Sequence, residues 1–198
     1  KASVLEGLGL PTFHNSNWAS TNMIASLAHA GSWLTRFPCV VSYADIFYAP
    51  SDLLKLVSAA HDVSIAYDPN WLSLWSLRFD NPLDDAETFR LRGDRITDIG
   101  QKPTAISDIE GQYMGLMKFT PVGWSAVAQL LMRYSELEQN QLDATTLLNS
   151  LVKSGTSVCG VPIENQWGEV DHPSDLTLYE QKLVAGAYPW AKGLDFRK

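Results

Sequence analysis

The alternation of short apolar runs with segments of helical periodicity constrains the fold of this chain most. The apolar run at residues 38–43 predicts a strand buried on both faces. Helices are expected before and after it in the sequence, over residues 21–34 and 52–60. A tight Arg-Gly-Asp turn predicts a small β-hairpin. The hairpin strands are expected at residues 88–91 and 95–99. The other strands are expected at residues 62–67, 112–119, 157–161 and 168–171. The other helices are expected at residues 122–134, 143–153 and 174–185. The pattern predicts an α/β protein with a mostly parallel central sheet and a hairpin insertion.

Composition narrows the class further. A chain of 198 residues that is 45% hydrophobic can bury the core of one domain, and without repeats or linkers we expect a single domain over residues 1–198. The net charge of −7 argues against nucleic acid as a partner. No apolar run reaches the roughly 18 residues of a membrane span, so no membrane partner is expected. Cys39 and Cys159 lie in apolar runs, which is typical of free, buried thiols in a cytoplasmic protein.

Two carboxylates follow predicted strands. Asp45 comes directly after the strand at residues 38–43, and Asp171 ends the one at 168–171. In open α/β sheets, ligands bind beyond the carboxyl ends of the strands. Two carboxylates there can hold one hard divalent cation through oxygen ligands. Alternatively, both aspartates cap turns.

The segment after residue 67 is rich in aromatic side chains. Trp71 and Trp75 lie four residues apart, with Asp68 close by in the sequence. Indole faces beside carboxylates suit a cationic amine. The same spacing is equally typical of a helical stripe that covers the core.

Other catalytic patterns are weak. The histidines have no zinc-type spacing with either cysteine, and neither cysteine lies in a nucleophile motif. The two glycines at residues 7–9 do not form a phosphate-binding loop.

Four segments together resemble a known family. Residues 15–27 are similar to the pattern Asn-x-x-aromatic-x-x-Thr-Asn-x-x-x-Ser-Leu of phosphocholine and 2-aminoethylphosphonate cytidylyltransferases. These enzymes belong to the sugar-phosphate nucleotidyltransferase superfamily. Residues 40–46 resemble its strand ending in a metal-binding Asp, residues 99–103 its Lys-Pro segment, and residues 167–176 its Trp-x-Glu-Ile-Asp block. The resemblance keeps the family's order over nearly the whole chain.

The resemblance implies a three-layer, Rossmann-like nucleotide-diphospho-sugar transferase fold. It also implies a Mg²⁺-dependent reaction in which a nucleoside triphosphate, CTP in this branch, reacts with a small phosphate or phosphonate and releases pyrophosphate. Asp45 and Asp171 would then be the metal ligands. Lys102 would orient the anionic end of the acceptor, or else face solvent after a turn. Asn22 would contact substrate, or else cap a helix.

The amine-bearing end of the acceptor would meet aromatic rings and carboxylates. Trp167, in the family's second metal-binding block, is a further candidate for substrate binding. The candidates for this end of the substrate are Asp68, Trp71, Trp75, Glu87, Glu110 and Tyr113.

One departure from the family is large. The Gly-x-Gly-x-Arg loop and the Pro-Lys pair that hold the nucleotide are missing, so we expect a domain truncated at its N-terminus. Two alternatives stay open: a sugar-1-phosphate nucleotidyltransferase, and a non-catalytic remnant of the fold that binds a small ligand or a protein. The sequence leaves the exact acceptor, the base and the oligomeric state undecided.

Overall fold

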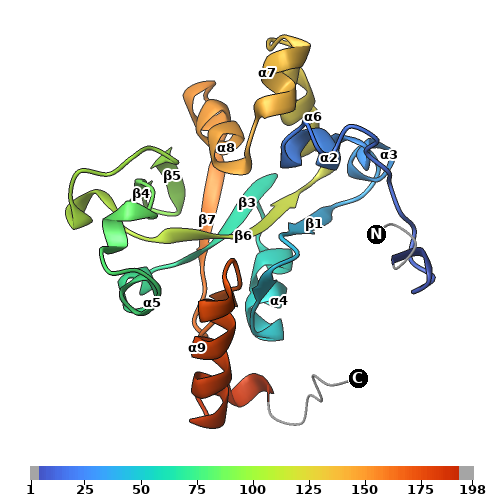
Figure 1. Cartoon of the computed structure of the whole chain (residues 1–198). Coiled ribbons are helices and arrows are strands. Elements are labelled where there is room, and N and C mark those ends of the chain that lie inside the picture. Colours follow the sequence, from blue (N-terminus) through green and yellow to red (C-terminus); the bar gives the residue numbers. More distant parts are fainter. Residues whose placement is uncertain (1–4, 192–198) are drawn as a thin grey trace.

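The computed structural model describes residues 5–191, and its centre is a six-stranded sheet in the order β1-β6-β3-β7-β5-β4 (Figure 1). Its strands are β1 (Cys39–Ser42), β3 (Val63–Asp68), β4 (Phe89–Arg92), β5 (Arg95–Ile99), β6 (Gln112–Phe119) and β7 (Val158–Pro162). A separate two-stranded ladder pairs β2 (Ile46–Phe47) with β8 (Gly168–Glu169).

The predicted α/β class is confirmed, but the pairing differs from the expected mostly parallel sheet. Among the named strands of residues 5–191, only β3 and β7 pair in parallel, whereas β6 runs antiparallel to both β1 and β3. The expected hairpin is present as β4 and β5, and it adds two further antiparallel pairings. The described sheet is therefore mixed.

Strand β1 is less buried than its apolar sequence predicts. Val40 and Ser42 are exposed, while Cys39 and Val41 are half-buried. The reason is its position at the edge of the described sheet, where it pairs with β6 alone. The buried centre of the sheet is formed by β3 and β6 instead.

Helices lie on two sides of the sheet (Figure 1). On one side are α2 (Met23–Ala28), α6 (Pro121–Leu131), α7 (Glu136–Gln141) and α8 (Ala144–Lys153). On the other are α4 (Pro50–Ser58), α5 (Trp71–Arg78) and α9 (Pro173–Val184). The remaining short elements are α3 (Gly31–Leu34) and the 3₁₀ turns η1 (Pro82–Asp84), η2 (Ile106–Asp108) and η3 (Pro189–Ala191).

Local signals explain several helix boundaries. The Asp143 side chain accepts a hydrogen bond from the Thr146 N–H and so caps α8, as predicted. Gly155, at φ +86°, follows its end, as expected of a helix C-terminus. The helix expected over residues 21–34 is instead split into α2 and α3, and Asn22 rather than Thr21 caps α2.

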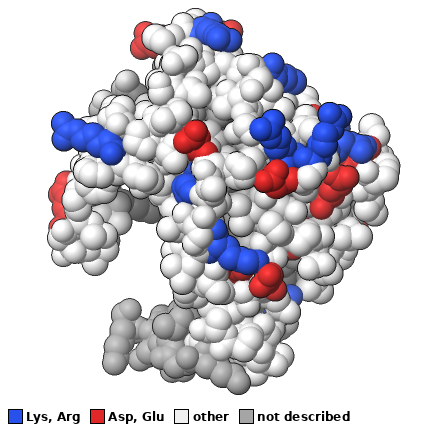
Figure 2. All heavy atoms as spheres, turned by 180° about the vertical axis from the view of Figure 1, so that it is seen from behind, with Lys and Arg blue, Asp and Glu red and all other residues white. Residues whose placement is uncertain are grey.

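The surface agrees with the charge argument. On the face shown in Figure 2, acidic and basic side chains are interspersed. Such mixing offers a phosphate backbone no continuous basic stripe on that face. Among residues 5–191, no helix is both long enough and apolar enough to cross a bilayer.

Candidate active site

A cleft of about 520 Å³ opens beside the carboxyl end of β1. Both predicted metal-binding aspartates line it, Asp45 after β1 and Asp171 after β8. The β2–β8 ladder brings them together, because Ile46 pairs with Glu169 and the Val170 N–H donates to the Asp45 carbonyl at 2.9 Å. Glu169 of β8 also lines the cleft. The rest of the wall comes from α2, from β1 and the two residues after it, and from β6; its residues are Met23, Ile24, Leu27, Val41, Ser42, Tyr43, Ala44 and Met117.

A buried arginine organises the acidic side of this cleft. Arg78, in the last turn of α5, has a side chain that is only 1% exposed. Its guanidinium donates to Asp171 Oδ2 at 2.5 Å, to Asp175 Oδ1 at 3.1 Å and to Glu169 Oε2 at 3.3 Å. The fork of donors therefore holds β8 and the start of α9 in one arrangement.

The acidic side chains shift one another's proton affinity. Burial, followed by the charges of Asp171 and Asp45, raises the pKa of Glu169 to about 7 despite the lowering effect of Arg78. For Asp175, hydrogen bonds from Arg78 and from the backbone outweigh burial and leave the pKa lowered. Negative charge is thus concentrated around Glu169.

These residues fit a hard divalent cation. Asp45 has no side-chain hydrogen bond in the described structure, and the Asp171 side chain is 43% exposed while Arg78 holds its Oδ2. Carboxylate oxygens are the ligands that Mg²⁺ takes in proteins, usually with several waters. A cation here would also offset the charge that raises the pKa of Glu169.

Two tyrosines lie next to this acidic group. The rings of Tyr43 and Tyr113 meet edge to face, with centroids 5.9 Å apart. Burial, followed by Tyr43 and the charges of Glu169 and Glu87, raises the pKa of Tyr113. The Tyr113 hydroxyl is buried and has no hydrogen-bond partner in the described part of the chain. Tyr113, predicted to bind the amine, thus packs against Tyr43, which lines the cleft together with Glu169, whereas neither Tyr113 nor Glu87 is itself part of the cleft wall.

The tryptophans of the predicted cage lie elsewhere. Trp71 and Trp75 are buried in the core, their rings 6.1 Å apart and edge to face, as the core-stripe alternative predicts. Trp167 is also buried, and its Nε1–H donates to Asp68 Oδ2 at 2.9 Å. Asp68 and Trp167 line a second cavity of about 360 Å³, which neither Trp71 nor Trp75 borders.

Three further candidates make local contacts outside the walls of either cavity. Lys102 is exposed, and its Nζ donates to the carbonyls of Leu83 and Asp84. Asn22 caps α2, and its amide also donates to the Gln141 carbonyl at 3.3 Å. The exposed carboxylate of Glu110 accepts the Leu91 N–H at 2.5 Å.

Comparisons with known proteins place this geometry in context. No protein-family model matches the chain. The chain is 31% identical over 184 residues to the CTP:phosphoglutamine cytidylyltransferase of Campylobacter jejuni, covering 86% of this chain and 72% of that protein.

Solved structures show the same fold. The inositol-1-phosphate CTP transferase of T. maritima superposes with a TM-score of 0.72 at 18% identity, over 98% of this chain and 73% of that one. A Bacillus anthracis protein described as a glucose-1-phosphate thymidylyltransferase superposes with a TM-score of 0.64 at 11% identity, over 93% and 65% of the two chains.

Proposed function

This chain belongs to the sugar-phosphate nucleotidyltransferase superfamily and is a nucleotidyltransferase; from that premise we propose that it transfers the cytidylyl group of CTP to a small phosphate or phosphonate that also carries an amine. The observation that carries the proposal is the 31% identity to an enzyme named for CTP and phosphoglutamine. The family and the enzymatic class argue against the non-catalytic alternative.

In the proposed reaction, an oxygen of the acceptor's phosphate or phosphonate attacks the α-phosphorus of CTP. The bond from the α-phosphorus to the bridging oxygen breaks, and pyrophosphate leaves with that electron pair. Such a reaction depends mainly on positioning and on charge neutralisation. Asp45 and Asp171 would hold Mg²⁺ at the cleft. When bound, the ion supplies positive charge against the triphosphate.

We assign the amine of the acceptor to the group around Tyr113. Glu87 and Glu169 supply negative charge there, and Tyr43 and Tyr113 supply ring faces and a hydroxyl without a partner. An ammonium group prefers this combination to the amide side chains that suit sugar hydroxyls. Phosphoglutamine, as an amino-acid derivative, bears such an ammonium group.

Lys102 stays the proposed contact for the anionic end of the acceptor. Its hydrogen bonds to Leu83 and Asp84 position a positive charge in the loop that follows β5. We expect Lys102→Met to raise the KM for the acceptor about tenfold with little change in kcat, the loss of about 1.4 kcal/mol typical of one charged contact. An unchanged KM would instead assign the lysine to anchoring the loop. Lys153→Met, at the end of α8, is the matched control.

Pyrophosphate release by the full-length protein tests the reaction. The assay combines Mg²⁺ with each of four nucleoside triphosphates and with phosphoglutamine, phosphocholine, 2-aminoethylphosphonate and hexose 1-phosphates. Release with CTP and an amine-bearing acceptor is the expected result. Release with hexose 1-phosphates but with no amine-bearing acceptor would favour the sugar-phosphate alternative. Release with another nucleoside triphosphate but not with CTP would overturn the assignment of cytosine as the base.

Two substitutions test the metal assignment. Asp45→Asn and Asp171→Asn should each lower kcat at least about a hundredfold, because charge stabilisation by a metal contributes several kcal/mol to such reactions. Glu136→Gln, an exposed acid-to-amide change on α7, is the control that should keep full activity. Because Asp171 also contacts Arg78, folding of that variant must be confirmed by circular dichroism. Unchanged turnover in a folded Asp45→Asn protein would contradict the assignment of Asp45 as a metal ligand.

A further inference from the structure

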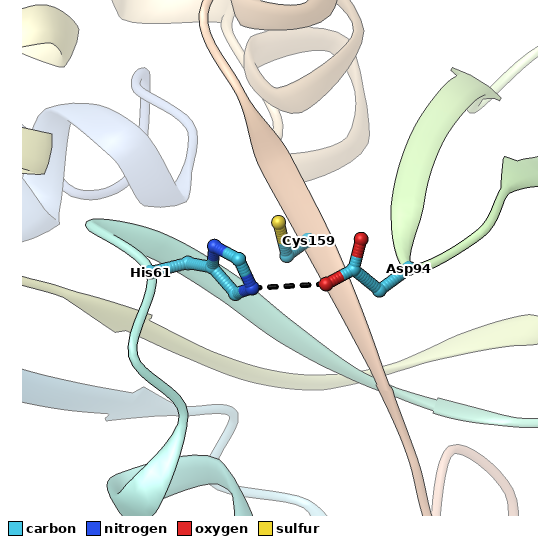
Figure 3. Close-up of side chains that lie close together, drawn as sticks. All are labelled: His61, Asp94 and Cys159. Carbon is cyan, nitrogen blue, oxygen red and sulfur yellow. Dashed lines mark hydrogen bonds and ion pairs between the residues drawn. The ribbon is translucent and has the colours of Figure 1, made fainter.

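A second group of ligand-type side chains lies at the amino ends of β3 and β7 (Figure 3). His61 precedes β3, Asp94 comes from the turn between β4 and β5, and Cys159 lies near the start of β7. One nitrogen, one carboxylate oxygen and the sulfur all lie within 4.8 Å of one another. Over residues 5–191, these three form the one group of three or more His, Cys, Asp or Glu side chains with that geometry.

This group is separate from the carboxylate cleft. Strands β1, β3 and β7 share one direction, because β6 is antiparallel to both β1 and β3 while β7 is parallel to β3. Asp45 follows the carboxyl end of β1, whereas His61 and Cys159 lie at the amino ends of their strands. The proposed nucleotidyl transfer therefore makes no use of these three side chains.

We propose that His61, Asp94 and Cys159 bind one zinc ion, with water as the fourth ligand, and that the ion fastens the β4–β5 hairpin to the sheet. Imidazole nitrogen, thiolate sulfur and carboxylate oxygen are the donors zinc takes in proteins. Ligand atoms around a tetrahedral zinc lie roughly 3.3–3.7 Å apart, given the usual zinc–ligand lengths. The present separations, 2.9 Å between His61 Nε2 and Asp94 Oδ2 and at most 4.8 Å to the third atom, are close to that range. Mg²⁺ and Ca²⁺ prefer oxygen donors and would not select a site containing sulfur.

Access and charge agree with an ion bound at the surface. The side chains of His61 and Asp94 are 42% and 60% exposed, and Cys159 is 1% exposed beneath them. In Figure 3 the cysteine sulfur lies beside the His61–Asp94 pair, whose Nε2 and Oδ2 atoms are 2.9 Å apart. A thiolate and a carboxylate together balance the two charges of the ion.

A reactive thiol explains this group less well than a metal site. A nucleophilic cysteine needs a lowered pKa. Burial raises the pKa of the Cys159 thiol, the opposite of what a nucleophile needs. Metal binding instead displaces the thiol proton.

The location gives the ion a structural task. The hairpin pairs with the rest of the sheet at one residue pair, Arg95 with Cys159. One more backbone hydrogen bond runs from the Gly160 N–H to the Asp94 carbonyl at 2.8 Å. A zinc ion held by His61, Asp94 and Cys159 would add a link between the hairpin turn, β3 and β7, where the backbone supplies few.

Metal binding by chelator-treated protein tests the proposal without any assay of turnover. Titration of Zn²⁺ against a chromophoric chelator should give one equivalent per chain, and Zn²⁺ should raise the melting temperature. Cobalt(II) should give a thiolate-to-metal charge-transfer band. Cys39→Ser, which changes the other free cysteine, should leave all three results unchanged.

Variants of the ligands decide the outcome. Cys159→Ser should abolish the cobalt band, and His61→Gln and Asp94→Asn should each weaken zinc binding at least about tenfold, the lower bound seen for changes around metal sites. His61 and Asp94 are exposed, so their variants remain informative if Cys159→Ser fails to fold. No zinc bound at micromolar concentration would overturn the proposal. So would binding unaffected by both His61→Gln and Asp94→Asn.

Discussion

Arg78 Nη2 lies 2.5 Å from Asp171 Oδ2, so one of the two proposed metal ligands is held by a buried guanidinium at the end of α5. The same guanidinium also binds Glu169 and Asp175. It lies over the rings of Trp75 and Phe79, at 5.8 and 5.1 Å from their centroids. Arg78 thus couples the aromatic core to the position of a site carboxylate.

Replacing Arg78 should destabilise the fold strongly. Arg78→Met leaves Asp175 buried without its partner, and breaking a buried ion pair on one side costs about 3–5 kcal/mol. Arg78→Lys keeps the positive charge but loses the forked set of guanidinium donors, so the loss of stability should be intermediate. Urea unfolding measures both. Arg90→Ala is the control, since Arg90 is 47% exposed in its pair with Asp108 and should contribute at most about 1 kcal/mol. Equal losses for Arg78→Met and Arg90→Ala would contradict this account.

The sequence contains no local signal for Arg78. Arg78 and Asp175 are 97 positions apart, and only the folded chain brings α5 against the start of α9. Similarly, the group of His61, Asp94 and Cys159 lacks any motif spacing because it comes from three separate elements. Local chemistry did predict what depends on neighbours in the chain: the β4–β5 hairpin, the full extent of β6, and the Asp143 cap of α8.

The aromatic cluster also shows that local sequence patterns alone do not decide which residues form the site. The four-residue spacing of Trp71 and Trp75 fitted a cage and a core stripe equally well, and their burial in the core distinguishes the two. Both Tyr113 and Glu87 were predicted as amine contacts, but Tyr43 and Glu169 were not. Glu169 lies in the Trp-x-Glu-Ile-Asp block, so its position next to Asp171 was the available signal.

The hydrogen bond from Trp167 to Asp68 should contribute substantially to stability. Trp167→Phe removes the Nε1–H donor 2.9 Å from a buried carboxylate, whose pKa burial already raises. A hydrogen bond to a charged group contributes about 1.5–3 kcal/mol, and we expect a loss of this size in chemical unfolding. Trp33→Phe, at an exposed tryptophan, should change stability by no more than about 0.5 kcal/mol. A similar loss at both positions would rule out the hydrogen bond as the cause.

Gly115 should tolerate no side chain. Its φ is +78°, and a Cβ would lie 2.7 Å from the Tyr43 ring. Gly115→Ala combines backbone strain of about 1–2 kcal/mol with overpacking of about 1–3 kcal/mol, so we expect a loss of about 2–5 kcal/mol. Gly93→Ala provides the comparison, because Gly93 has φ +65° but open space around it, and only the strain should appear. The difference in unfolding free energy between the two variants isolates the contact with Tyr43.

The loop around η2 should contribute stability that depends on pH. Hydrogen bonds from the Thr104 backbone and hydroxyl, the Ala105 N–H and Arg90 lower the pKa of Asp108. A lowered pKa means that the contribution is complete above the unfolded value of about 4 and is lost as pH falls through the folded value. Asp108→Asn should therefore lower stability more at pH 7 than at pH 3 in urea unfolding. A difference of the same size at both pH values would be inconsistent with a contribution from the charge.

The β2–β8 ladder consists of two residue pairs, and its strands come from opposite halves of the chain. Pairings between distant segments gain little until the loop between them has closed. Asp45 and Asp171 therefore become neighbours only when the intervening sheet and helices are in place. Any ligand that needs both carboxylates consequently binds only the completed fold, and its binding free energy adds to the free energy of unfolding.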